Sequence, residues 1–230
     1  MRLAVIPARG GSKRILRKNI KEFCGKPIIA WSIEAAINSG CFDDVIISTD
    51  DDEIANIARH YGANVPFMRP DVLSDDHTGT IPVIRHAIEW FEANGKKPAE
   101  ICCIYATAPF VQAEEICRGL DIMGTSHSDY VFSVTSYPFP IQRAIRITAN
   151  QHIEMFNPEH FNTRSQDLEE AFHDAGQFYW GRADAWINEK PIFGQESSPI
   201  ILPRHRVQDI DTIEDWVRAE WMFKALHAIP

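Results

Sequence analysis

The chain lacks long apolar runs, and its basic residues are outnumbered by acidic ones. No stretch of its 230 residues approaches the roughly 18 apolar residues that a membrane helix needs. The apolar run at residues 3–7 is too short for a signal peptide. The net charge of −9 argues against nucleic-acid binding, which requires a basic face. We therefore expect no membrane and no nucleic acid among its partners.

Cysteine is scarce as well, and its pattern excludes two classes of protein. The five cysteines are odd in number, and Cys102 and Cys103 are adjacent inside an apolar run. This pattern indicates buried free thiols in a reducing compartment, rather than a disulfide framework or a metal knuckle. We therefore expect a cytoplasmic location.

Short apolar runs alternate with amphipathic segments along most of the chain. The runs predict strands within residues 3–7, 44–49, 100–109, 129–135 and 199–203. The amphipathic segments predict helices within residues 28–40, 50–61, 81–94 and 114–123, and a closing helix after a strand end within residues 206–226. This alternation predicts one α/β domain over residues 1–230, with helices on both faces of a mostly parallel sheet.

Residues 136–180 interrupt this rhythm. They contain aromatic residues, prolines and two short alternating segments, but no β-α-β pattern. We interpret them as an excursion within the single domain, with its own strands and a helix near residues 166–172.

The first loop concentrates positive charge in an otherwise acidic chain. Its sequence "ARGGSKR" follows the first strand, and six basic residues lie between Arg9 and Lys21. Glycines let backbone N–H groups approach an anion, and cationic side chains neutralise its charge. Ligands of such sheets bind beyond the carboxyl ends of the strands, where this loop belongs. The loop therefore predicts a phosphate site, although a solvated basic turn is the alternative on local grounds.

Several segments resemble one enzyme family in order and separation. They are "IPARGGSK", "STDDDEIA", "RPDVLSDD" and "QDIDTIEDW". Together they resemble the cytidylyltransferases that activate nine-carbon acidic sugars, the CMP-sialic acid synthetase family. The segments "SVTSYPFPIQRAI" and "PRHRVQDIDTIEDW" look like the branch that acts on pseudaminic acid. The resemblance implies a three-layer, Rossmann-like nucleotide-diphospho-sugar transferase fold in which residues 136–180 form a homodimer and help to bind the sugar.

The reaction that this resemblance implies is a transfer of CMP. CTP and pseudaminic acid would give CMP-pseudaminic acid and pyrophosphate, with the anomeric hydroxyl as the nucleophile. The alternatives are the same reaction on acetylneuraminate or legionaminate, and a non-catalytic nucleotide-binding protein.

The resemblance also assigns site residues. Arg9 and Lys18 would be catalytic, and Arg69 would contact the cytosine. The expected nucleotide-binding residues are Arg9, Gly10, Gly11, Ser12, Lys13, Lys18, Asn19, Arg69, Thr78 and Thr80. The expected sugar-binding residues are Tyr105, Gln142, Arg143, Arg164, His173 and Asp174. For Asp75 and Asp76, the alternative to a loop role is capping of the following helix.

Asp209 and Asp211 are candidate Mg²⁺ ligands. Two carboxylates two residues apart at a strand end would point to the same side and could share a cation. The alternative is a helix cap, in which Asp211 or Thr212 pairs with Glu214 or Asp215. The resemblance places metal ligands at Asp209 and Asp211 and so favours Mg²⁺ as the cofactor.

Overall fold

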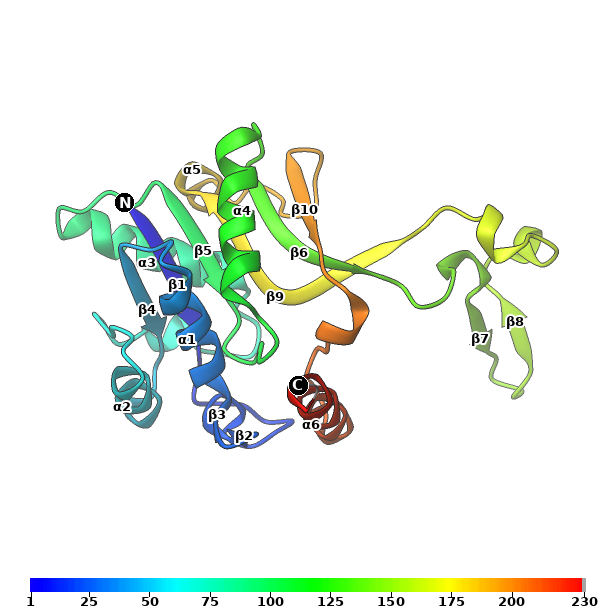
Figure 1. The fold of residues 1–230 in the computed structure, drawn as a ribbon, viewed down its shortest axis with the longest axis horizontal. Helices are drawn as coiled ribbons and strands as arrows, with labels where there is room; N and C mark the ends of the chain where they lie inside the picture. Colours follow the sequence, from blue (N-terminus) through cyan, green and yellow to red (C-terminus); the bar gives the residue numbers. More distant parts are fainter. Residues whose placement is uncertain (229–230) are drawn as a thin grey trace.

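A single six-stranded sheet organises the chain in the computed structural model, which describes residues 1–228 (Figure 1). The strands are β1 (Arg2–Pro7), β4 (Asp44–Ser48), β5 (Glu100–Ile104), β6 (Tyr130–Ser136), β9 (Phe172–Arg182) and β10 (Ser197–Ile201), and their order is β10-β6-β9-β5-β1-β4. Only β9 runs antiparallel to its neighbours in this sheet. The predicted mostly parallel sheet is confirmed.

Helices cover both faces of the sheet. They are α1 (Ile28–Ser39), α2 (Asp52–His60), α3 (Thr80–Ala93), α4 (Ala113–Thr125), α5 (Ala183–Ile187) and α6 (Ile213–His227). Helices α1, α2 and α4 share one apolar cluster with the sheet, whereas α3 and α5 share the other. Within residues 1–228, no helix combines the length and apolar character that a bilayer crossing requires.

Strand β1 shows why the apolar runs are continuous. Ala4 and Ile6 pack into the cluster of α1, whereas Leu3 and Val5 pack into the cluster of α3. A strand buried on both faces needs apolar residues at every position, as parallel sheets do. Cys102 and Cys103 divide in the same way between the two clusters, and all five cysteines are free thiols.

The carboxyl ends of β1, β4 and β5 meet at one edge of the sheet, as expected. The first loop, which leads through the short strands β2 (Glu22–Phe23) and β3 (Lys26–Pro27), also contacts the last helix. Ile15 and Phe23 pack with Ile210 and Trp216 in a third apolar cluster. This packing brings residues 207–212, which we call the carboxylate loop, beside the first loop.

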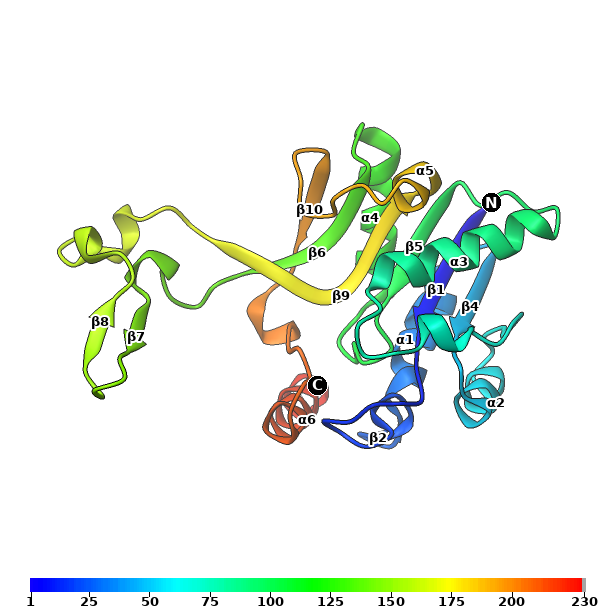
Figure 2. The ribbon, with the colours of Figure 1, turned by 180° about the vertical axis from the view of Figure 1, so that it is seen from behind.

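Residues 137–171 leave the sheet between β6 and β9 and project from it (Figures 1 and 2). We call this segment the arm. It contains a two-stranded ribbon of β7 (Ile145–Ile147) and β8 (Ile153–Met155). The expected helix at residues 166–172 is wrong: one 3₁₀ turn at Ser165–Asp167 is followed by extended chain into β9. Short helices depend on packing of an apolar face, and residues 166–170 are largely exposed.

The strand end expected before the closing helix is also wrong. A 3₁₀ turn at Arg204–Arg206 leads into the carboxylate loop, which pairs with no strand among the described residues. The alternation on which the prediction rested is nevertheless present. Ile210 is fully buried, whereas Asp209 is exposed and Asp211 is partly exposed. The two carboxylates thus flank a residue that anchors the loop in the core.

Candidate active site

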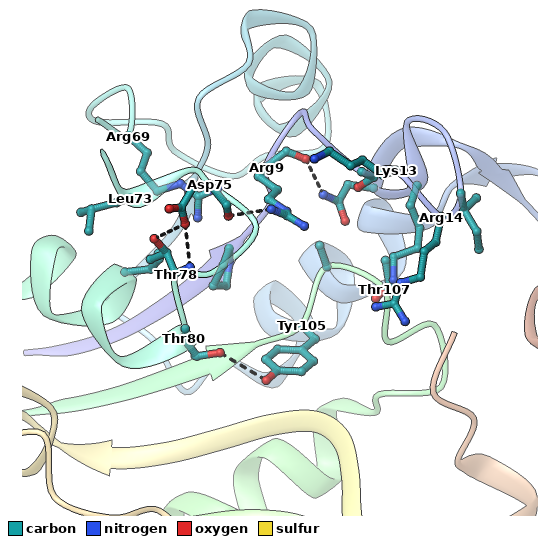
Figure 3. A pocket seen from close by; sticks show the side chains of 18 residues that line it. Arg9, Lys13, Arg14, Arg69, Leu73, Asp75, Thr78, Thr80, Tyr105 and Thr107 are labelled. Carbon is teal, nitrogen blue, oxygen red and sulfur yellow. Dashed lines mark hydrogen bonds between the residues drawn. The ribbon is translucent and has the colours of Figure 1, made fainter. Parts of the chain in front are cut away.

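A cleft lies at the carboxyl edge of the sheet, between the first loop, residues 69–80 and the end of β5 (Figure 3). Most residues predicted to bind nucleotide line it, together with one predicted sugar contact: Arg9, Ser12, Lys13, Lys18, Asn19, Arg69, Thr78, Thr80 and Tyr105. Arg14, Asp75 and Thr107 also line it, although the sequence analysis did not assign them to the site. Arg14 is nevertheless one of the six basic residues from which the sequence analysis predicted a phosphate site in the first loop.

Gly10 and Gly11 belong to the same loop but differ in role. The Gly10 N–H donates to Asp50 Oδ1 at 2.9 Å, so this amide is engaged within the protein. A Cβ atom at Gly10 would lie 2.7 Å from Asp51 Oδ2. Gly10 is therefore required by the close approach of the loop to the start of α2. A Cβ at Gly11 would meet no atom within 4 Å, which leaves this position open to a ligand.

Residues 69–80, the segment of the cleft that faces the first loop, contain Asp75 and Asp76, which contact the cations of that loop. Arg9 Nη1 donates to the Asp75 carbonyl oxygen at 2.6 Å and lies 2.7 Å from the Asp76 carboxylate (Figure 3). Lys13 pairs with Asp76 as well. Asp76 thus holds the two cations that the family resemblance assigns to the triphosphate.

Asp75 organises the turn before α3. Its Oδ1 atom accepts hydrogen bonds from the backbone and the hydroxyl of Thr78, both at 2.7 Å. These bonds lower the pKa of Asp75. The alternative role of Asp75 or Asp76, capping of α3, does not apply, because Gly79 occupies the N-cap position and makes no side-chain cap bond.

Asp76→Asn should lower the KM for CTP about threefold, because an exposed ion pair competes only modestly with a phosphate for the same cations. Steady-state kinetics at fixed sugar concentration measure this effect. Asp71→Asn removes the same charge from the same segment without touching Arg9 or Lys13, and should leave the KM unchanged. A higher KM in Asp76→Asn would show that Asp76 orients Arg9 instead of competing for it.

Lys18 and Asn19 line the cleft and also donate hydrogen bonds to the backbone of neighbouring segments. Lys18 Nζ donates to the Ile210 carbonyl oxygen at 2.6 Å and lies 3.6 Å from Asp211. Asn19 Nδ2 donates to the Arg9 carbonyl oxygen at 2.9 Å. Lys18 therefore joins the first loop to the carboxylate loop.

Asp211 is not the cap of α6. Thr212 and Asp215 form the capping box of this helix, which is one of the residue pairs that the sequence analysis offered for it. The Asp211 carboxylate instead pairs with Arg14 at 2.8 Å. Although Asp209 as a whole residue is exposed, its pKa is raised, first because the surrounding protein removes part of the water around the carboxyl group and second by repulsion from Asp211. A cation between the two groups would relieve this repulsion.

The donor set of this pair fits Mg²⁺. Carboxylate oxygens are hard ligands, and Mg²⁺ typically takes one or two of them while phosphates and water complete its octahedron. Within residues 1–228, no three or more Asp, Glu, His or Cys side chains gather into a metal cage. The pair therefore suits an ion that arrives with a phosphate substrate.

A line of hydroxyl groups connects the cleft to His173 and Asp174. Thr80 Oγ1 and Tyr105 OH are 3.2 Å apart (Figure 3), and the Tyr105 ring lies 5.2 Å from that of Tyr179. The Tyr179 hydroxyl donates to Asp174 Oδ2 at 2.5 Å. Burial raises the pKa of both tyrosines, so their hydroxyls stay protonated. Tyr179, which reads as a core residue in the sequence, thus lies behind the cleft.

His173 and Asp174 do not line the cleft themselves. His173 Nδ1 lies 2.8 Å from the Asp174 carbonyl oxygen, and its ring packs against Tyr137 at 4.8 Å between centroids. The two residues are therefore placed at the base of the arm, one layer behind Tyr105.

Three predicted sugar-binding residues are not brought to the cleft of their own chain. Gln142, Arg143 and Arg164 lie on the arm, which points away from the sheet (Figure 2). Gln142 Nε2 donates to the Glu169 carbonyl oxygen at 3.0 Å, and Arg164 pairs with Asp167 at 2.7 Å. The side chains of Gln142 and Arg164 therefore contact other parts of the arm instead of the cleft.

Comparisons with known proteins identify the family of the chain. The family model described as cytidylyltransferase matches residues 3–217. The chain is 45% identical to the pseudaminic acid cytidylyltransferase of Campylobacter jejuni, over 98% of this chain and 97% of that protein. It is 31% identical to the CMP-N,N'-diacetyllegionaminic acid synthase of Legionella pneumophila, over 95% and 94% of the two chains.

Among solved structures, the fold is similar to that of CMP:2-keto-3-deoxy-manno-octonic acid synthetase complexed with CTP. The TM-score is 0.70 over 98% of this chain and 99% of that one, at 14% identity. At such low identity the similarity concerns the fold, and it confirms the nucleotidyltransferase architecture that the sequence predicts. By its family match and its relatives, the chain belongs to the cytidylyltransferase family.

Proposed function

We propose that this cytidylyltransferase transfers CMP from CTP to the anomeric hydroxyl of pseudaminic acid and releases pyrophosphate. The observation that carries the proposal is the convergence of Arg9, Lys13 and Lys18 on one cleft at the edge of the sheet, where Lys18 also lies 3.6 Å from Asp211 of the carboxylate loop. The choice of sugar is supported by the higher identity to a pseudaminic acid enzyme than to a legionaminic acid enzyme.

The chain's own residues would act by positioning and by neutralising charge. The sugar hydroxyl attacks the α-phosphorus in line, and such a step depends on orientation and preorganised electrostatics. Arg9 and Lys13 would exchange Asp76 for oxygens of the triphosphate, forming charge-assisted hydrogen bonds. Gly11 leaves room for a close approach.

Arg69 would recognise the base. The residue is only 5% exposed, and its Nη2 atom makes no hydrogen bond within the described chain. The Asp50 carboxylate lies 3.8 Å from this Nη2 atom. Buried donors without a partner are rare in native proteins, so this guanidinium group suits an acceptor supplied by a ligand. A cytosine carbonyl is such an acceptor.

We propose further that Asp209 and Asp211 hold Mg²⁺. When bound, this ion would orient the α-phosphate and offset charge on the leaving pyrophosphate. Lys18 and Arg14, which contact the carboxylate loop, would keep the pair close to the triphosphate.

A panel of nonulosonic acids tests the reaction and its specificity together. Pyrophosphate release is measured with CTP and Mg²⁺ on pseudaminic, legionaminic and N-acetylneuraminic acids, with mass spectrometry of the products. We expect the highest kcat/KM with pseudaminic acid. A preference for another acid would refute the choice of sugar only, whereas CTP binding without turnover on any acid would refute catalysis.

We propose that the arm forms a homodimer. The described chain exposes 12335 Å², whereas a compact monomer of its 26.2 kDa would expose about 10,600 Å². Large apolar side chains of the arm are exposed to solvent: Phe139, Ile145, Ile147, Ile153, Phe156 and Phe161. A second copy could bury this surface and receive Arg164 in its cleft.

Mixing two inactive variants tests whether the arm serves the partner's cleft. Arg9→Ala damages the cleft, and Arg164→Ala damages the arm. A heterodimer has one intact cleft facing one intact arm, so random mixing should restore about a quarter of wild-type activity. Pyrophosphate release after unfolding and refolding the mixture measures this. No recovery would mean that each arm serves its own cleft or none.

His173 and Asp174 are the residues that we propose to select the sugar, acting behind Tyr105. The double variant His173→Ala/Asp174→Asn should lower kcat/KM for pseudaminic acid at least about tenfold, as for loss of a buried polar contact. The KM for CTP should stay nearly unchanged. Equal losses for both substrates would mean that the pair only supports the fold.

We infer a cytoplasmic location from the thiols. The five cysteines are odd in number, and Cys102 and Cys103 are adjacent and buried in the sheet. Buried free thiols of this kind are typical of proteins in a reducing compartment.

A further inference from the structure

A buried glutamine interrupts the apolar interior of β9. The pairing of β6 with β9 shifts between Phe132, which pairs with Tyr179, and Val134, which pairs with Asp174; the stretch of β9 between these partners contains Gly176, which has a φ of +63°. Ala175 and Phe178 lie in the same apolar cluster although they are three residues apart, so strict alternation is broken here. Gln177 lies in this irregular stretch and is only 4% exposed. Such bulges often redirect a side chain near an active site.

The buried amide of Gln177 has a specific partner. Its Nε2 atom donates to the Arg206 carbonyl oxygen at 2.6 Å. Arg206 precedes Asp209 by three residues and marks the start of the carboxylate loop. Its own side chain reaches Gln112 and, at 3.7 Å, Glu115, both at the start of α4. A buried amide is costly unless it is bonded, so this contact fixes the backbone at Arg206.

Gln177 also touches the other side of the site. Its backbone carbonyl accepts a hydrogen bond from the Tyr105 N–H at 2.9 Å. One residue thus joins the end of β5, where the cleft begins, to the segment that carries the two carboxylates.

Other contacts also hold the carboxylate loop. Lys18 Nζ donates to the Ile210 carbonyl oxygen at 2.6 Å, between the two aspartates, and Arg14 pairs with Asp211 at 2.8 Å. Downstream, the Asp211 N–H donates to Asp215 Oδ2 at 3.2 Å. Gln177 differs from these contacts because it comes from the sheet and holds the upstream end.

We infer that Gln177 is a positioning residue for Asp209 and Asp211: by holding Arg206 it fixes the direction in which the carboxylate loop enters the cleft. This inference rests on the proposed Mg²⁺ role of the two aspartates. Gln177 itself touches neither substrate nor metal. Residues that orient metal ligands in this way typically change metal affinity when they are replaced.

The test uses Gln177→Met, which keeps side-chain length and volume but removes the donor. Mn²⁺ alone, a hard ion that replaces Mg²⁺ in oxygen sites, is titrated into the full-length protein, and free Mn²⁺ is followed by electron paramagnetic resonance. We expect about tenfold weaker binding than in the wild type. The Mg²⁺ concentration for half-maximal rate should rise in parallel, while the KM for CTP at saturating Mg²⁺ stays within about twofold.

Two controls separate the possible failures. Ser198→Ala removes another hydrogen bond of the same sheet, between the Ser128 and Ser198 hydroxyls at 2.7 Å, without touching Gln177, its neighbours or the loop, and should bind Mn²⁺ normally. Asp209→Asn should bind Mn²⁺ weakly. Wild-type affinity in Asp209→Asn would overturn the metal site and this inference with it.

If Asp209→Asn binds weakly but Gln177→Met binds as the wild type does, only the positioning role is refuted. Weakened binding in Ser198→Ala would also refute it, because general loosening of the sheet would then explain the effect. Should Gln177→Met fail to fold, Gln177→Asn, which is polar but too short to reach Arg206, carries the same expectations.

Discussion

Asp209→Asn and Asp211→Asn should each reduce turnover by about 10³-fold or more, because both the charge and the oxygen ligands that hold a catalytic cation are impaired. The kcat for pyrophosphate release measures this effect. Excess Mg²⁺ should restore part of the activity, since an amide oxygen still coordinates weakly. Removal of metal by EDTA should silence the wild-type protein, and added Mg²⁺ should reverse the loss.

The structure makes Asp211→Asn a clear discriminator between metal binding and helix capping. Thr212 caps α6, so this variant should unfold at nearly the wild-type temperature. Thr212→Ala is the matched control: it should lose about 1 kcal/mol of stability, as N-cap removals do, but keep its activity at low temperature. A stable and fully active Asp211→Asn protein would contradict the metal role.

Arg9→Ala should lower kcat on the order of 10²–10³-fold, the usual cost of removing a preorganised donor from a developing charge. Arg9 lines the cleft, and within residues 1–228 its guanidinium group contacts Asp75 and Asp76 of the facing segment. Near-normal activity in the folded variant would exclude it from the triphosphate site.

Arg17→Ala is the control within the same loop. Its guanidinium group pairs with Asp51 and Glu53 instead of lining the cleft. The hydrogen bond from Arg17 lowers the pKa of Asp51 to about 2. Asp51 also caps α2 by accepting a hydrogen bond from Ile54 N–H. This variant should therefore lose stability but retain kcat. Equal losses of kcat in both variants would point to a general effect of charge on the loop.

The layers of the sheet were predictable because their causes are local. Residues 3–7 are apolar at every position, as burial on both faces requires, and the pattern changes to helical spacing after Pro27. The cleft was predictable for the same reason, since the carboxyl ends of parallel strands meet at one edge. The identity of the family came from the resemblance, which the comparisons confirm.

What the sequence could not predict depends on distant partners. Asp76 pairs with Arg9, which is 67 positions away in the chain, and Gln177 bonds to Arg206, which is 29 positions away. No periodic pattern in the sequence indicates either contact. The helix expected at residues 166–172 does not form because residues 166–170 are largely exposed, so no packed apolar face stabilises a short helix there. Gln142, Arg143 and Arg164 were assigned by resemblance, and their sequence positions carry no sign that they would lie outside the cleft.

The central place of β9 in the sheet has a consequence for synthesis on the ribosome. Strands β4, β1 and β5 are complete once residue 104 has emerged, but β5 and β6 are joined only through β9. Until residues 172–182 follow the arm, both strands present unpaired edges, which are templates for aggregation. While the arm is being synthesised, the two parts of the sheet therefore remain unjoined. The slow, non-local insertion of β9 then completes the fold.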